Sequence, residues 1–510
     1  MSTTQSPPTD GGTERISRRA RGVLLVLCGA VFLEGIDVSM MGVALPSIRA
    51  EMGMSTSSLQ WVVSAYVLGY GGFVLLGGRA ADLLGRRRMF LLWLGVFLVF
   101  SGLGGLATEG WVLIVARFMT GVSAGFMTPA GLSIITTSFA EGPARNKALL
   151  VYAGTAAAGF SLGLVVGGLL TAIDWRWVFF APVVMAAGIL VAAVRLFPTS
   201  THPPGPARSS GGFDLAGAIT VTGAMLLLVF TVVRAPEVRW GPTIATLAGS
   251  GALLAAFVAI ERRSAAPLVR LGILRSGSLV RANLGAMLFV GSFVAFQFVA
   301  VLYLQELRGW SALETGLALL VVGVDAVLAP TLTPRLVSRF GNVPVILAGM
   351  VLAAAAYALF LPVGLDWTYA AMLPTMILLG LAFSLAYGAL TIAATDGIAE
   401  EEQGLAGGLL NVSLQFGAAF GLAAAAAVNV AATGADGSPQ ALLDGYHAAL
   451  VVPVVAAVLG AAVTAFGLRK RSGPAADDMC YTHVAHGRQR PPRPPSRGAD
   501  LPLEERAAVP

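Results

Sequence analysis

The stretch Gly78-Arg79-Ala80-Ala81-Asp82-Leu83-Leu84-Gly85-Arg86-Arg87-Arg88 joins two long apolar segments and places an acid, a glycine and a basic cluster in one short connection. A tight turn requires glycine where the backbone must adopt a positive φ or pass close to a neighbour. Arginines clustered beside a membrane helix mark the cytoplasmic end of that helix. The stretch therefore predicts a tight cytoplasmic turn between two membrane-spanning helices.

The composition of the whole chain is that of a membrane protein. Of its 510 residues, 56% are hydrophobic and 12% are charged, whereas soluble domains carry about 25% charged residues. About fourteen stretches, 312–333 among them, are apolar over the roughly 18 residues that a spanning helix needs. We therefore expect an all-α polytopic membrane protein with the lipid bilayer as its surroundings.

The apolar stretches fall into groups of six, two and six, and a break rich in Pro, Gly and Ser follows the first six, as expected of a linker between rigid bundles. The predicted parts are a disordered cytoplasmic tail (1–21), an N-terminal six-helix bundle (22–197), a cytoplasmic linker (198–213), two additional transmembrane helices (214–260), a second cytoplasmic linker (261–280), a C-terminal six-helix bundle (281–468) and a disordered, basic, Pro-rich cytoplasmic tail (469–510).

Basic residues gather in the loops that alternate counting assigns to one side of the membrane. This asymmetry predicts cytoplasmic N- and C-termini and an even number of helices. One loop departs from the pattern, because residues 396–403 carry four acids and no base. No cleavable signal peptide is expected, since residues 1–21 are polar and the first apolar run lacks a clear cleavage site. The predicted location is the plasma (inner) membrane.

The turn has a second, altered copy in the other half of the chain. Aligning Gly341 with Gly85 sets residues 334–341, Pro-Arg-Leu-Val-Ser-Arg-Phe-Gly, against residues 78–85. Ser338 replaces Asp82 in this copy, so the acid is lost. Internal repetition of this kind favours two halves of one architecture.

The sequence offers little for an enzyme, a metal site or a nucleic-acid surface. Cys28 lies in the first apolar stretch and Cys480 in the tail, so neither a disulfide nor a thiolate metal site is expected. No phosphate-binding G-x-x-x-x-G-K-[ST] loop occurs around Lys147 or Lys470, the two lysines. The arginines follow the helix ends, which indicates membrane topology rather than nucleic-acid binding. We expect no cofactor and no resident metal.

Five motifs in order give the chain a family resemblance. Gly78-x-x-x-Asp82-x-x-Gly85-Arg86-Arg87 resembles the loop between helices two and three of the major facilitator superfamily. The six-two-six pattern is similar to its fourteen-helix drug:proton antiporter branch. The four further matching stretches are Ile36-Asp37-Val38-Ser39 through Val43-Ala44-Leu45-Pro46, Gln60 to Tyr66, Arg117-x-x-x-Gly121, and Trp175-Arg176-Trp177. The resemblance implies a major facilitator fold of two six-helix bundles plus two additional helices.

Three charged residues inside apolar stretches are candidates for proton coupling. Glu34 and Asp37 are three residues apart and share a helix face, and each ionised acid at membrane depth costs roughly 2.5–3.5 kcal/mol. If that face lines a cavity, desolvation favours their protonated form. Arg117 needs an acid partner, and both Asp37 and Glu34 are open candidates. The alternatives are a shallow acid that satisfies a polar neighbour and an arginine that reaches for the membrane surface.

Other polar residues are candidates for substrate binding. Asp325 is the one charge between Gly316 and Leu332, and the resemblance implies a role for an acid of this helix in recognising cationic drugs. A structural Asp325 bonded to a neighbour is the alternative. The remaining candidates are Gln297, Tyr387, Asn411 and Gln415, the last two four residues apart on one helix.

Glycines form the remaining motifs. Gly159, Gly163 and Gly167 recur every four residues beside Gly168, a small-residue stripe that lets helices approach closely. The stripe resembles the antiporter motif of exporters, although Leu164 stands where that motif has proline. The expected cytoplasmic latch consists of Gly78, Asp82, Gly85, Arg86 and Arg87, with simple anchoring by positive charge as the alternative.

These features together predict a proton-coupled exporter of hydrophobic, cationic drugs or antibiotics that works by alternating access and functions as a monomer. A narrow exporter of one self-made natural product and a facilitator-type importer are the first alternatives. A membrane-embedded enzyme or sensor is a remote one, because short loops leave no room for a catalytic domain.

Overall fold

The computed structural model describes residues 18–139, 143–197, 215–234, 240–264, 271–396, 398, 403–434 and 438–471. Most of both predicted tails, the first linker and part of the acidic loop lie outside the described residues, as does the side chain of Asp82. Every regular element in the described part is a helix. The predicted all-α class is therefore confirmed for these ranges.

The helices of the first half are α1 (Arg18–Met52), α2 (Thr56–Leu84), α3 (Arg86–Gly105), α4 (Gly110–Ser138), α5 (Pro143–Ile173) and α6 (Trp177–Leu196). The next two are α7 (Leu215–Arg234) and α8 (Trp240–Glu261). A short 3₁₀ turn, η1 (Leu271–Arg275), leads into the second half. That half contains α9 (Gly277–Leu302), η2 (Tyr303–Leu307), α10 (Ala312–Leu320), η3 (Val321–Val324), α11 (Asp325–Phe340), α12 (Asn342–Phe360), α13 (Tyr369–Thr395), α14 (Gln403–Thr433) and α15 (Pro439–Arg471).

Among the described residues, 12 helices are long and apolar enough to cross a membrane by length and composition, and two shorter apolar helices cover Ala216–Leu228 and Ala312–Val324. The described residues thus contain about twelve long apolar helices. The predicted count of fourteen is not confirmed and stays a prediction.

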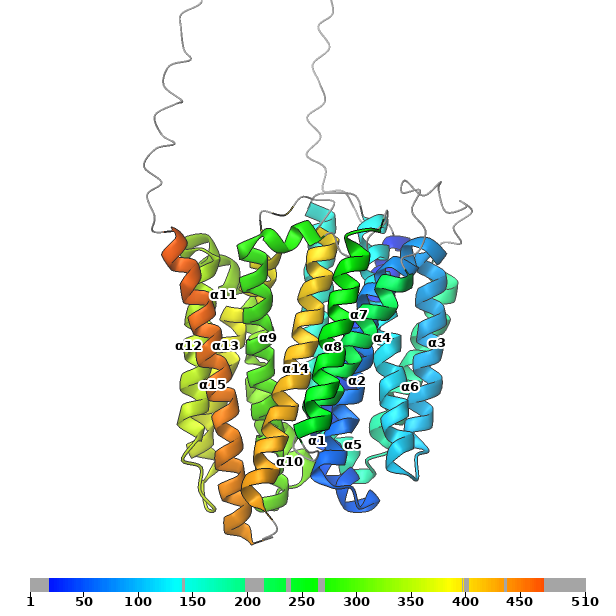
Figure 1. Cartoon of the computed structure of the whole chain (residues 1–510). Helices are drawn as coiled ribbons and strands as arrows, with labels where there is room; N and C mark the ends of the chain where they lie inside the picture. Colours follow the sequence, from blue (N-terminus) through cyan, green and yellow to red (C-terminus); the bar gives the residue numbers. More distant parts are fainter. Residues whose placement is uncertain are drawn as a thin grey trace, which may run out of the picture. The chain divides into compact units, whose positions relative to one another are not determined.

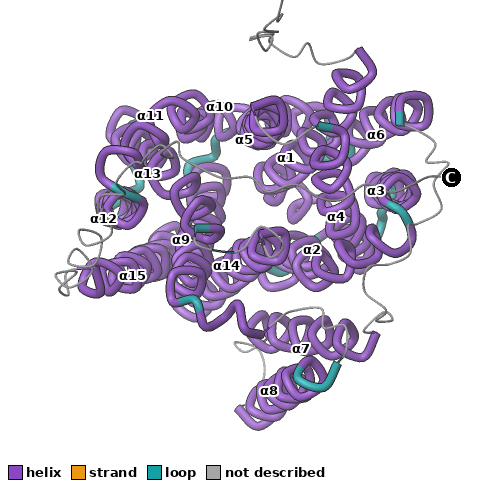
Figure 2. The backbone as a smooth tube through the Cα atoms, turned by 90° about the horizontal axis from the view of Figure 1, so that it is seen from above, coloured by secondary structure: helices purple, strands orange, loops and turns teal. Residues whose placement is uncertain are grey.

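The helices α1–α6 lie together on one side and α9–α15 on the other (Figure 1). Seen from above, α2 faces α14 and α5 faces α10, while α7 lies outside the ring against α2 and α14 and α8 packs on the outer side of α7 (Figure 2). The hydroxyl of Thr222 on α7 donates to the Gly72 carbonyl of α2 at 2.7 Å. The extra pair therefore covers the α2–α14 contact on its outer side.

The two copies of the sequence repeat form the same turn. Gly85 separates α2 from α3 with φ 97°, and Gly341 separates α11 from α12 with φ 82°. Each amide donates back into the preceding helix, to Ala81 at 3.1 Å and to Val337 at 2.8 Å. A left-handed φ is accessible to glycine at little cost, and of the two reasons for glycine in a tight turn, a positive φ is the one that applies at Gly85.

One predicted helix is divided. The apolar stretch 312–333, expected as one continuous helix, forms α10, the 3₁₀ segment η3 and α11. The break falls on Val321-Val322-Gly323-Val324, where β-branched residues and glycine lower helix propensity. Gly323 also lies against Ser161 of α5, whose hydroxyl would be 2.6 Å from an added Cβ. The 3₁₀ segment η3 therefore lies where this helix is in close contact with α5.

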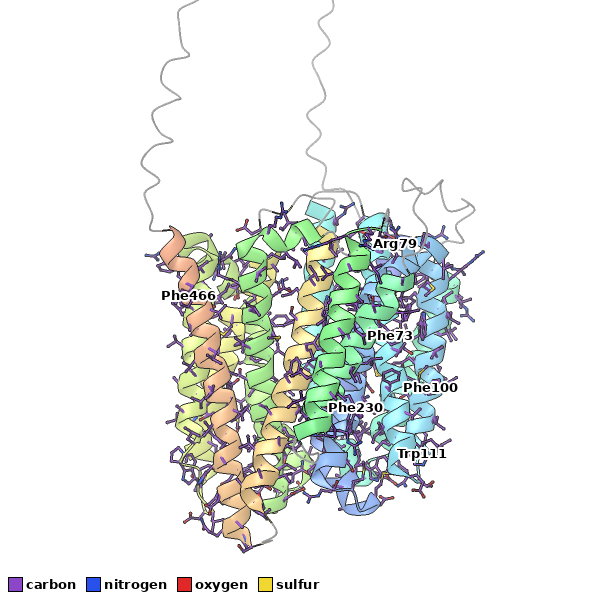
Figure 3. All side chains as sticks on the ribbon, viewed as in Figure 1. Phe73, Arg79, Phe100, Trp111, Phe230 and Phe466 are labelled. Carbon is purple, nitrogen blue, oxygen red and sulfur yellow. The ribbon has the colours of Figure 1, made fainter. Side chains whose placement is uncertain are left out.

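The two ends of the helical body differ in charge. We call the end that carries Gly85 and Gly341 the arginine end, and the opposite end, where α1 finishes at Met52, the far end. Figure 3 shows Arg79 near the arginine end and Trp111 near the far end.

Candidate functional site

Asp37 and Arg117 of the first bundle form a buried ion pair. Arg117 Nη1 lies 2.7 Å from Asp37 Oδ2, and both side chains are 1% exposed. The guanidinium also contacts the Val62 carbonyl at 3.4 Å and lies 4.5 Å from the centre of the Tyr66 ring. Asp37 Oδ1 is buried and has no hydrogen-bond partner in the part of the chain that the structure describes. The structure thus pairs Arg117 with Asp37 rather than with Glu34 or the membrane surface.

Glu34 has a different environment on the same helix. Glu34 is buried, with 8% of its surface exposed. The Thr128 hydroxyl of α4 lies 2.9 and 2.8 Å from its two carboxylate oxygens. The Tyr70 hydroxyl of α2 donates to Thr128 Oγ1 at 3.1 Å. In the described part of the chain, the hydrogen-bond partner of Glu34 is therefore a neutral hydroxyl, whereas Asp37 has a cation.

Glycines hold α2 and α4 close enough for these contacts. A Cβ added at Gly121 would overlap the Tyr66 carbonyl, and one at Gly125 would lie 2.9 Å from the Tyr70 carbonyl. Small residues allow helix backbones to touch in this way. The close contact places Tyr70 against Thr128, which precedes the helix proline Pro129.

The candidates of the second bundle lie partly together. Asp325 is the first residue of α11 and is half-buried, and Tyr387 of α13 is 45% exposed. Their helices, α11 and α13, pack against each other. The structure therefore places both candidates on neighbouring helices of the second bundle.

Two of the three amide candidates lie against other helices, and the third is bonded within its own helix. The Gln297 amide nitrogen is 3.5 Å from the position of a Cβ at Gly42 of α1. Asn411 donates to the Gly407 carbonyl of its own helix at 3.3 Å, and Gln415 packs on Gly71 of α2. Their predicted substrate contacts stay predictions.

The glycine stripe of α5 packs mainly within its own bundle. Added Cβ atoms at Gly159, Gly163 and Gly167 would lie 2.6–2.8 Å from backbone atoms of α1. Gly168 instead faces α10, and a Cβ added there would lie 2.6 Å from the Ala312 carbonyl oxygen. Leu164, at the place of the motif proline, is 2% exposed, and its carbonyl packs on Gly316 of α10. The stripe therefore joins α1 to α5, and its last turn reaches the second bundle.

A charged contact at the far end joins the two bundles. Arg49 Nη1 of α1 is 2.8 Å from both carboxylate oxygens of Glu306 in the π-helical segment η2. Beside it, Gln305 donates to the Val43 carbonyl at 2.9 Å. Sequence reasoning missed Arg49 and Glu306, as it missed Thr128 and Tyr70. The far end is therefore held closed in this structure.

The latch is described only in part. Arg86 Nη1 donates to the Ser133 carbonyl at 3.2 Å, and Arg87 Nη2 donates to the Val194 carbonyl at 3.3 Å. Gly78 lies beside Pro129, 3.7 Å from an added Cβ. The arginines thus tie the start of α3 to α4 and α6, and the latch role stays a prediction. No group of three metal-ligating residues occurs in the described ranges.

Comparisons with known proteins agree with this architecture. The Major Facilitator Superfamily model matches residues 27–422. The chain is 35% identical to the cephamycin export protein CmcT of Amycolatopsis lactamdurans, covering 88% of this chain and 93% of the relative. It is also 35% identical to the puromycin resistance protein pur8 of Streptomyces alboniger, covering 92% and 95%. A solved POT family transporter in complex with 5-aminolevulinic acid is similar in fold, with a TM-score of 0.67 at 14% identity over 90% and 97%. The chain belongs to the Major Facilitator Superfamily and is a membrane transporter.

Proposed function

We propose that this transporter exports hydrophobic drugs or antibiotics across the plasma membrane in exchange for protons, by alternating access and as a monomer. The observation that carries the proposal is the Asp37–Arg117 pair, sealed inside the first bundle at 1% exposure of both side chains. The names of relatives such as the cephamycin export protein support the direction and kind of transport.

The pair offers a way to couple a proton to the movement of the bundles. Among the described residues Asp37 Oδ1 has no hydrogen-bond partner, so it can take a proton without displacing one. Protonation removes the charge that balances Arg117, and an uncompensated buried charge is costly. Arg117 then gains from a conformation that gives it water or another acid. Loss of the proton on the other side of the membrane restores the pair.

The topology follows from the charge distribution. We propose that the two shorter apolar helices also cross the membrane, with α10, η3 and α11 forming one span, which gives fourteen helices. An even number leaves both termini on one side, and the arginine end is the cytoplasmic one. The far end, closed by Arg49 and Glu306, then faces outward, so this structure corresponds to an inward-facing or occluded form.

Asp325 and Tyr387 are the proposed contacts for a cationic, apolar substrate. An acid beside an exposed aromatic ring attracts organic cations by charge and by cation–π interaction, and Tyr387 is 45% exposed. The relatives are named for two different antibiotics, so a narrow exporter of one natural product is the second candidate.

Accumulation of ethidium and of puromycin in cells that make the protein tests the proposal. We expect at least one of them to accumulate less than in cells without the protein, and a protonophore to abolish the difference. Asp325→Asn should weaken export of ethidium, and Asp366→Asn, in the loop before α13, serves as the matched control. Unchanged accumulation of a wide panel of cationic drugs would support the narrow exporter, and export insensitive to the protonophore would contradict proton coupling.

A further inference from the structure

The Thr128 hydroxyl has more acceptors than hydrogens. It lies 2.9 and 2.8 Å from the oxygens of Glu34 and 3.0 Å from the Ala124 carbonyl of its own helix. It also accepts a hydrogen bond from Tyr70 at 3.1 Å. A hydroxyl has one hydrogen and two acceptor lone pairs. The hydrogen can therefore point to Glu34 or to Ala124, but not to both.

Each protonation state of Glu34 selects one of these two directions. When Glu34 is ionised, it can only accept, so Thr128 donates to it. When Glu34 is protonated, its own O–H can donate to Thr128 Oγ1, and the threonine hydrogen turns to the Ala124 carbonyl. In either arrangement each hydroxyl or carboxyl hydrogen has an acceptor, so the hydroxyl can reverse without leaving a buried donor unsatisfied.

The reversal changes the bond that holds Tyr70. With Glu34 ionised, Thr128 donates to a negative charge, which makes its oxygen a better acceptor for the Tyr70 hydroxyl because linked hydrogen bonds polarise one another. With Glu34 protonated, that oxygen already accepts from the carboxyl group and no longer donates to an anion. Tyr70 is therefore held more firmly in the ionised state.

Tyr70 lies at the boundary between the bundles. It belongs to a buried cluster that also contains Val412 and Phe416 of α14. Its own position on α2 is fixed by the contact between its carbonyl and Gly125 of α4. A change in how firmly its hydroxyl is held therefore acts on the contact between α2 and α14, where the two bundles meet.

We infer that Thr128 and Tyr70 are positioning residues that transmit the protonation state of Glu34 to the contact between α2 and α14, where the two bundles meet. The inference rests on the proposed proton-coupled export and adds a second acid with its own output, separate from the Asp37–Arg117 pair.

Several other groups face Glu34 and must be separated from the effect of Thr128. They are Asp37 on the same helix, Tyr66 and Tyr70 on α2, and Tyr152 on α5, with Arg117 of α4 beside Asp37. Of these, only Tyr70 is bonded to Thr128 and changes its hydrogen bonding when Thr128 is replaced. Thr128→Val keeps the shape and removes the hydroxyl, and Thr128→Ser keeps the hydroxyl.

The experiment measures ethidium transport by the full chain in proteoliposomes, once driven by an imposed pH gradient and once as counterflow of labelled against unlabelled ethidium without a gradient. In Thr128→Val and in Tyr70→Phe we expect gradient-driven transport to fall about tenfold or more, the scale of one hydrogen bond to a charged group. Counterflow should stay within about twofold of the parent, and Thr128→Ser should restore a large part of the driven transport and the parent pH profile.

Two results would overturn the inference. If Thr128→Val keeps both the driven rate and the pH profile of the parent, the hydroxyl transmits nothing. If Thr128→Val and Thr128→Ser lose driven transport and counterflow equally, the threonine has a structural role. Failure of the parent protein itself to respond to the gradient is distinguishable from both, because it removes the proposed proton coupling on which the inference rests.

Discussion

Replacing Asp37 with Asn tests whether the ion pair is as deeply buried as the structure indicates. Both side chains are 1% exposed and the contact is 2.7 Å long. Removing one partner of such a pair costs about 3–5 kcal/mol of stability, because the other charge stays buried and unbalanced. Arginine stays protonated in proteins, so Arg117 cannot avoid the penalty. We therefore expect Asp37→Asn to lose about 3–5 kcal/mol of unfolding free energy and all gradient-driven export.

Two further variants separate stability from transport. Arg117→Met leaves Asp37, which can take up a proton and become neutral, so it should be less destabilising than Asp37→Asn. The double variant Asp37→Leu/Arg117→Met removes both charges, and apolar replacement of a whole buried pair is often neutral or stabilising. It should regain stability but not transport. The assay is equilibrium unfolding in detergent for the three variants and the parent, together with export in cells.

The reasoning is refuted if Asp37→Asn lowers the unfolding free energy by less than about 1 kcal/mol, the value typical of exposed pairs. It is also refuted if the double variant is less stable than either single variant, because the two changes would then not share one penalty.

Three other predictions concern the frame of the site. Arg49→Ala should shift the equilibrium at the far end toward the open form by at most about fivefold, since a partly exposed ion pair is worth up to about 1 kcal/mol. Labelling of a reporter cysteine at the far end measures this shift. The double variant Arg49→Glu/Glu306→Arg, which exchanges the two charges, should restore the closed form. Gly163→Ala should cost about 1–3 kcal/mol through overpacking against α1, whereas Gly154→Ala on the same helix meets open space; equal thermal stability of the two would contradict the packing. Gly85→Ala should cost about 1–3 kcal/mol of backbone strain at its φ of 97°, and an unchanged unfolding midpoint would argue against that conformation.

Local features of the sequence predicted the tight turns and the positions of most helices. A tight turn with a positive φ at Gly85 is expected because this one glycine connects two helices. Gly341, its copy in the second half, forms the same turn. The positions of most helices followed from long apolar runs, because a spanning helix must satisfy its backbone within one continuous segment. The division of 312–333 was missed because hydropathy does not distinguish a 3₁₀ turn from an α-helix.

Contacts between helices were harder to foresee. Thr128 and Glu34 are 94 residues apart, and Arg49 and Glu306 are 257 apart. A threonine in an apolar helix is common, so nothing in the sequence marked Thr128. The choice between Asp37 and Glu34 as the partner of Arg117 also depends on the position of α4 along its own axis relative to the neighbouring helices. That position is set by the close contacts of Gly121 and Gly125 with α2, which a single sequence does not reveal.

The central claim is that substrate and proton movements are obligatorily linked. The most direct test places the purified transporter in liposomes that contain a pH indicator, and applies an ethidium gradient with no initial pH difference. Export in exchange for protons predicts that the ethidium gradient drives protons in the opposite direction, and that Asp37→Asn abolishes this proton movement. Ethidium movement without any change of internal pH in the parent protein would contradict the account.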